Sequence, residues 1–289
     1  MRTEQQMLDL IISTAQEDDR IRAAILNGSR ANPDAPRDFF QDFDIVYFVS
    51  DPSPFRRNRE WIKRFGELMI LQLPEDMRDP PPADDEGWAY LMQFTDGNRF
   101  DLSIYPLHKL AEKCSDSLTV VLLDKDGRIG PLPPPSDRDY LPQPPTEKAF
   151  ADCCNEFWWC SPYVAKGLWR GELPYAKCML DEVVRTELMK MLRWHIGLQT
   201  GFQVNPGKLG KYFSKYLEPE LWERFEKTYS GLGREETWEA LFSMCDLFRQ
   251  VAIPIAESYG FEYPFEDDRR VTAHLHHVRT LPQDAREMY

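Results

Sequence analysis

Apolar residues in the first part of the chain fall in short alternating runs that are typical of β-strands. Alternation with a period of two places one face of a strand in a core. Runs of this kind predict strands at 21–27, 43–49, 68–73, 88–94, 99–105 and 118–124. Apolar positions at helical spacing, and short segments between the strands, predict helices at 3–18, 55–65 and 106–113. The first part is therefore expected to be a mixed β-sheet flanked by helices.

Strand signals almost vanish in the second part of the chain, where apolar positions recur every three or four residues. This spacing predicts helices at 147–169, 174–199, 218–229 and 234–259. One stripe along the second of these is apolar and ends in a histidine, as expected for a core-facing side: Leu180, Val184, Leu188, Met191 and His195. The second part is expected to be a helical bundle.

A proline-rich stretch, PLPPPSDRDYLPQPP at 131–145, separates the two patterns. Proline removes a backbone donor and fixes φ, so this stretch fits neither a helix interior nor a central strand. We expect a semi-rigid linker here. The predicted class is α+β, with an N-terminal domain at 1–135 and a C-terminal helical domain at 146–289.

Composition indicates the binding partners and the cellular compartment of the protein. The 289 residues carry a net charge of −13, which disfavours binding of nucleic acid and favours binding of cationic ligands. The alternative is that the charge only keeps the protein soluble. The six cysteines form no C-x-x-C pair and are expected to be reduced thiols. Residues 1–20 are polar, and no apolar stretch approaches the roughly 20 residues that span a bilayer. We expect a cytoplasmic protein that binds no membrane; nothing in the sequence indicates its oligomeric state.

Three acidic residues interrupt the apolar strands of the first part. Asp42 and Asp44, in Q-D-F-D-I-V, are two residues apart and therefore point the same way. Asp101, in R-F-D-L-S-I-Y, faces away from the apolar side of its own strand. If the two strands are neighbours, the three carboxylates converge, and a pair of Mg²⁺ ions between them would remove their repulsion. The alternative for Asp42 and Asp44 is a pair of solvated acids at an exposed strand end.

The first predicted strand ends in a Gly-Ser-Arg sequence. Gly28 permits a phosphate to approach the backbone closely, and the Ser29 hydroxyl and the following amides can donate hydrogen bonds to it. Arg30 would add a charge-assisted donor. Without the acids that follow, the same residues would be an ordinary turn. The sequence contains no G-x-x-x-x-G-K-[ST] phosphate-binding loop.

The order of these motifs, G-S, D-x-D and a distal Asp, resembles the DNA polymerase β-like nucleotidyltransferase superfamily. More narrowly, LNGSRANPDAPRDFFQDFDIVYFVSD at 26–51 and RFDLSI at 99–104 resemble the aminoglycoside 6-adenylyltransferases, also called streptomycin adenylyltransferases. The resemblance implies a nucleotidyltransferase domain followed by a helical substrate-binding domain. It also implies transfer of AMP from Mg-ATP to a hydroxyl of streptomycin, expected at the 6-position, with release of pyrophosphate and resistance to the antibiotic.

The resemblance implies roles for individual residues. Asp42, Asp44 and Asp101 become metal ligands, and Ser29 and Arg30 become contacts to the ATP phosphates.

The acceptor hydroxyl must lose a proton as it attacks, and related enzymes place a carboxylate in or beside the cleft between domains for this purpose. Asp181 and Glu182 lie off the apolar stripe and are the candidates for this general base. The alternative is a surface ion pair with Arg185, which follows at i+4 and i+3.

Two further groups are candidates for substrate contacts. Lys208 and Lys211, in N-P-G-K-L-G-K-Y, would reach the β- and γ-phosphates, or else are solvated. Trp88, with the acids Asp84 and Glu86, would hold a guanidinium-bearing sugar by cation–π contact and hydrogen bonds. The alternative is a core tryptophan beside a solvated loop.

Two functional alternatives remain within this fold. The chain would act on another acceptor, a protein or a small molecule, or it would bind nucleotide without turnover. Retention of all three acids favours an active enzyme.

Overall fold

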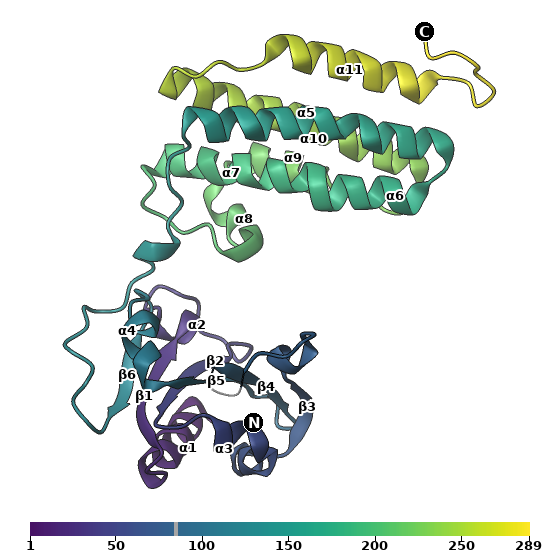
Figure 1. Ribbon diagram of the computed structural model, residues 1–289. Coiled ribbons are helices and arrows are strands. Elements are labelled where there is room, and N and C mark those ends of the chain that lie inside the picture. The colour runs from purple at the N-terminus through teal and green to yellow at the C-terminus, as the bar shows by residue number, and fades with distance from the viewer. Residues whose placement is uncertain (84–85) are drawn as a thin grey trace. The chain divides into compact units, whose positions relative to one another are not determined.

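The chain folds into two compact units, Met1–Asp139 and Tyr140–Tyr289, in a computed structural model that describes residues 1–83 and 86–289 (Figure 1). The division falls inside the proline-rich stretch 131–145. That stretch contains one 3-10 turn, Arg138–Tyr140, and otherwise neither helix nor strand, as expected where proline removes backbone donors. That the two units are domains with separate roles stays a prediction.

The N-terminal unit is built on a six-stranded mixed sheet with the order β3-β4-β5-β2-β1-β6. The strands are Ile21–Asn27 (β1), Phe43–Val49 (β2), Leu68–Gln72 (β3), Trp88–Phe94 (β4), Arg99–Pro106 (β5) and Val120–Asp124 (β6). β2 and β5 run parallel, and the other neighbouring pairs are antiparallel. The mixed sheet that the alternation predicts is confirmed.

Helix α1 (Glu4–Glu17) precedes the first strand, and the other helices of this unit are short and lie between strands. They are α2 (Gly28–Ala31), α3 (Ser53–Arg57) and α4 (Leu110–Lys113), with 3-10 segments at Arg59–Phe65, Pro74–Met77 and Leu107–Lys109. The single helix predicted at 55–65 is wrong, because Asn58 leaves helical geometry and its side chain accepts a hydrogen bond from the Glu60 backbone amide. The segment predicted at 106–113 likewise divides into a 3-10 turn and α4.

The two faces of the sheet differ in depth of packing. The face under α1 buries Phe43, Ile45, Phe100 and Leu102 completely or nearly so. The opposite face carries the alternate residues of β2 and β5, and its smaller core lies beside α4. The side chains between the buried positions of β2 and β5 are therefore directed to the less covered face.

The C-terminal unit is entirely helical. It contains α5 (Glu147–Arg170), α6 (Leu173–Cys178), α7 (Arg185–Thr200), α8 (Phe213–Tyr216), α9 (Pro219–Glu226), α10 (Arg234–Tyr259) and α11 (Phe265–Thr280). A π-helical turn, Met179–Val184, joins α6 to α7 within the stretch predicted as one helix. No helix among the described residues is long and apolar enough to cross a membrane.

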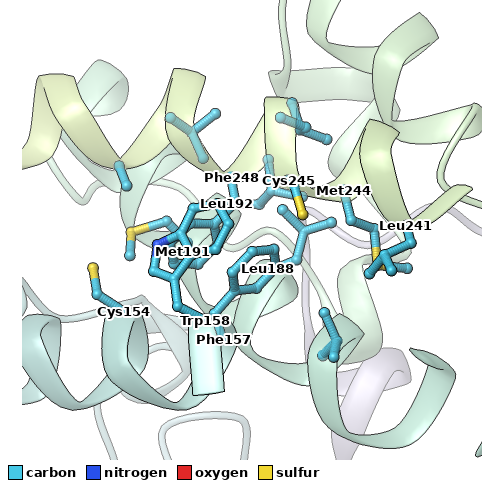
Figure 2. Close-up of a cluster of buried hydrophobic side chains, with 14 of the residues drawn as sticks. Cys154, Phe157, Trp158, Leu188, Met191, Leu192, Leu241, Met244, Cys245 and Phe248 are labelled. Atoms are coloured by element: carbon cyan, nitrogen blue, oxygen red, sulfur yellow. The ribbon is translucent and has the colours of Figure 1, made fainter. Parts of the chain in front are cut away.

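Aromatic packing holds the centre of this unit. Figure 2 shows Phe157 and Trp158 of α5 among apolar side chains of α7 and α10. The Phe157 ring stacks on Phe248 with centroids 3.8 Å apart, and Trp158 meets the same ring edge-on. The predicted stripe from Leu180 to His195 is buried, which confirms it as a core face.

The six cysteines, all within the described residues, are free thiols. Five are buried, and Cys178 at the end of α6 is exposed.

A buried carboxylate joins α10 to α11. Asp268 accepts two hydrogen bonds of 2.6 Å from the Arg249 guanidinium and one of 2.8 Å from the Tyr263 hydroxyl. The pairing raises the pKa of Arg249, and burial raises the pKa of Tyr263. Because Asp268 is only 4% exposed, these donors replace the water that its carboxylate lacks.

Replacing Arg249 by Met would leave the Asp268 carboxylate buried without its counter-ion. We expect the free energy of unfolding to fall by about 3 kcal/mol, measured by urea denaturation followed by far-UV circular dichroism. Arg269→Met is the matched control, because Arg269 pairs with the exposed Glu266 and should change stability little. Equal effects of the two substitutions on stability would contradict the role of Arg249 as the counter-ion of Asp268.

Candidate active site

Three carboxylates meet on the less covered face of the sheet. Asp44 on β2 and Asp101 on β5 are direct partners in the parallel register, and Asp42 comes just before β2. One oxygen of each lies within 4.8 Å of the others, and all three residues are partly exposed. The convergence expected from the sequence is present, because the two strands are neighbours.

Gly28 fits closely against this cluster. It follows β1 and begins α2 with a φ of +71°, a conformation that favours glycine. A Cβ atom at this position would lie 2.1 Å from Asp44 Oδ2, which is far inside van der Waals contact. The glycine is therefore required for the Asp44 carboxylate to occupy its place. Its expected contact to a phosphate stays a prediction.

Ser29 and Arg30 are both joined to the segment that leads into β2. The Ser29 hydroxyl lies 3.3 Å from the Gln41 amide nitrogen, within hydrogen-bond distance. Arg30 donates from Nε to the Asp42 carbonyl at 2.9 Å and from Nη2 to the Gln41 carbonyl at 2.7 Å. These contacts hold the turn after β1 against the residues that carry the first acid.

The arrangement around Arg30 differs from the expected contact to ATP phosphates. Its side chain is only 7% exposed, lies 3.9 Å over the Phe43 ring and pairs with Glu4. Burial lowers the pKa of its guanidinium, and the Glu4 carboxylate opposes that change. The donors face protein oxygens, so Arg30 holds the backbone that carries Asp42. Its expected contact to the ATP phosphates stays a prediction.

Arg99, the first residue of β5, pairs with the acidic cluster. Its Nε and Nη2 atoms donate to the two oxygens of Asp101 at 2.9 and 2.7 Å, and Nε lies 3.7 Å from Asp42 Oδ2. The Asp101 carboxylate raises the pKa of Arg99, with contributions from Asp42 and Asp44. Sequence reasoning missed this residue, although the spacing R-x-D on one strand places Arg99 and Asp101 on the same face.

The cluster fits a hard divalent cation. Carboxylate oxygens are the ligands that Mg²⁺ prefers, and three of them meet here from two adjacent strands and the segment before β2. Gly28 leaves room for the Asp44 oxygen to reach the common position. The donor set therefore suits the metal that the sequence motifs indicate.

The candidate general bases lie in the π-helical turn of the C-terminal unit. Asp181 accepts from Arg185 at 2.9 Å and pairs with Lys177 at 3.3 Å, so the ion pair weighed as its alternative is present. Arg185 also donates to the Thr228 hydroxyl and carbonyl oxygen, each at 2.8 Å. Glu182 is exposed. A π-helical turn is frequent at functional sites, which keeps both acids as candidates.

The remaining predicted contacts have different settings. Lys208 and Lys211 are exposed at a 3-10 turn of the C-terminal unit, and their phosphate contacts stay predictions. Trp88 is only 4% exposed in the core of the N-terminal unit, so it does not offer the open aromatic face that a sugar contact needs. Burial of its apolar ring in the sheet core explains the difference. Glu86 is exposed, and Asp84 lies outside the described residues.

Comparison with known proteins gives consistent relatives. The family model "Streptomycin adenylyltransferase" matches residues 1–278. Aminoglycoside 6-adenylyltransferases from Bacillus subtilis and Campylobacter jejuni are 42% and 43% identical over 93% of this chain, covering 95% and 93% of those proteins. The crystal structure of an aminoglycoside 6-adenyltransferase from Bacillus subtilis is 37% identical and covers 97% of this chain and 100% of that one, with a TM-score of 0.48.

With relatives of this kind and an acidic cluster on adjacent strands, the chain is a nucleotidyltransferase. Nearly its whole length matches a single family. The chain belongs to the streptomycin adenylyltransferase family.

Gly28→Ala tests the fit between the turn and the acids. The added methyl would displace the Asp44 carboxylate, and we expect transferase activity to fall by about 10²-fold, with binding of Mn²⁺ weakened in parallel. Gly127→Ala is the matched control, because Gly127 also has positive φ but open space around it. Both variants carry roughly 1 kcal/mol of backbone strain. Equal activity in the two would contradict the role of Gly28.

Proposed function

We propose that this chain is an aminoglycoside 6-adenylyltransferase that transfers AMP from Mg-ATP to a hydroxyl of streptomycin, releasing pyrophosphate. The observation that carries the proposal is the convergence of Asp42, Asp44 and Asp101 beside Gly28, in a chain whose relatives are named for this activity. The net charge of −13 supports a cationic acceptor and opposes a polynucleotide one. We propose that the enzyme acts in the cytoplasm and confers resistance to the antibiotic.

The proposed reaction is an in-line displacement at the α-phosphorus of ATP. The acceptor oxygen forms a bond to that phosphorus, the bond to the bridging oxygen of pyrophosphate breaks, and the hydroxyl proton passes to a base. Mg²⁺ held by the three carboxylates, expected as two ions, supplies positive charge beside the phosphates. Gly28 and Ser29 are proposed to border the phosphates, with Lys208 and Lys211 reaching their distal end.

Asp181 or Glu182 is proposed as the base that receives the proton. Asp181 is held by Arg185 and Lys177, which would fix the direction of its carboxylate. Glu182 is exposed on the next position of the same turn. An ionised carboxylate is suited to accept a proton from a hydroxyl that is becoming bonded to phosphorus.

A pyrophosphate-release assay with Mg-ATP tests the acceptor. We expect release with streptomycin and none with aminoglycosides built on 2-deoxystreptamine. In Asp44→Asn the activity should fall by roughly 10²–10³-fold or more, because the cluster loses a negative ligand. No release with any aminoglycoside would favour another acceptor, or nucleotide binding without turnover.

Single substitutions separate the two candidate bases. Asp181→Asn or Glu182→Gln should lower kcat by about 10²–10⁴-fold, while the affinity for ATP, measured by calorimetry, stays near that of the unmodified protein. Asp152→Asn, at an exposed ion pair with Lys148 in α5, is the control and should leave kcat unchanged. Normal turnover in both base variants would rule out this proposal.

A further inference from the structure

The acidic cluster has a cation of its own. Arg99 uses two donors on the two oxygens of Asp101 and also lies 3.7 Å from Asp42. Two parallel N–H···O bonds of this kind are the strongest pairing that a carboxylate makes with a side chain. Arg99 thus supplies in the protein itself the positive charge that three converging carboxylates require.

The same atoms are the ones that a divalent cation would use. Both oxygens of Asp101 are engaged by Arg99, and the side chain of Asp101 is only 17% exposed. A metal ion bound to this carboxylate and to Asp42 would lie a few ångströms from the guanidinium. Two positive charges at such a separation repel each other by an amount that corresponds to about tenfold or more in affinity.

The Arg99 side chain also lies at the surface of the sheet. Arg99 begins β5, and its side chain is 47% exposed, so the guanidinium can leave the cluster without disturbing the sheet. Arg30, by contrast, is buried and fixed to the backbone carbonyls of Gln41 and Asp42. Of these two arginines, only Arg99 combines direct contact with the acids and an exposed side chain.

We propose that Arg99 is the resident counter-ion of the acidic cluster, which neutralises Asp101 and Asp42 in the metal-free protein and competes with the divalent cation for them. The inference rests on the proposed metal site. Its consequence is that the free enzyme binds metal weakly, because each binding event must first displace an internal ion pair. Removing the positive charge of Arg99 should therefore strengthen metal binding and at the same time destabilise the metal-free protein.

The test is titration of the nucleotide-free, full-length protein with Mn²⁺, followed by loss of the free-ion signal in electron paramagnetic resonance. We expect Arg99→Gln to bind Mn²⁺ about tenfold tighter or more. Its melting temperature should be lower without metal and should rise more than that of the unmodified protein when Mn²⁺ is added. Arg99→Lys keeps a positive charge, so its affinity should lie closer to that of the unmodified protein.

The matched control is Arg22→Gln. Arg22 also uses two nitrogens on one carboxylate, that of Asp126, in the same unit, but neither residue belongs to the cluster. Its Mn²⁺ affinity should not change. An affinity of Arg99→Gln equal to that of the unmodified protein, or weaker, would overturn the competition.

The variant Asp101→Asn shows whether an unchanged Mn²⁺ affinity of Arg99→Gln contradicts only the competition or the proposed metal site as well. If Asp101→Asn abolishes Mn²⁺ binding while Arg99→Gln leaves the affinity unchanged, the metal site stands and the competition is wrong. If Mn²⁺ binding is the same in Asp101→Asn and in the unmodified protein, the metal site itself is wrong and the inference about Arg99 falls with it.

Discussion

Asp42, Asp44 and Asp101 repel one another, and the fold of the N-terminal unit must keep them together against this repulsion. The parallel register of β2 and β5 sets Asp44 directly beside Asp101. The buried residues that flank each acid along its strand fix that register. Slippage by one residue would move these apolar side chains out of the core. The hydrophobic pattern therefore does more than build the sheet, because it prevents the acids from moving apart.

Much of this arrangement could be predicted from the sequence, because strand alternation determines which side chains share a face. The acids of β2 and β5 follow that rule, and so does the sheet itself. The surroundings of Arg30 and Trp88 could not be predicted in this way, because a short motif does not encode how deeply a side chain is buried. Arg30 looks like a phosphate ligand in the sequence, but its place behind the turn gives it backbone carbonyls as partners.

In the helical unit, too, features set by local spacing could be predicted, and features set by contacts between distant segments could not. The apolar stripe along the π-helical turn and α7 follows from its spacing, whereas α11 has few buried apolar positions that would predict it. Besides Leu275 and Val278 in the apolar core, α11 carries the buried carboxylate of Asp268, whose partner Arg249 lies on α10. The π-helical turn at Met179–Val184 was equally invisible, because one extra residue in a turn leaves the composition of the segment unchanged.

The distribution of the cysteines has a practical consequence. Burial raises the pKa of Cys114, Cys153, Cys154, Cys160 and Cys245 and keeps them from solvent, whereas Cys178 is exposed at the end of α6. A thiol-reactive dye added to the folded protein would therefore attach at one position, immediately before the π-helical turn. The unmodified chain thus provides a native attachment point for a fluorescent reporter beside its candidate bases.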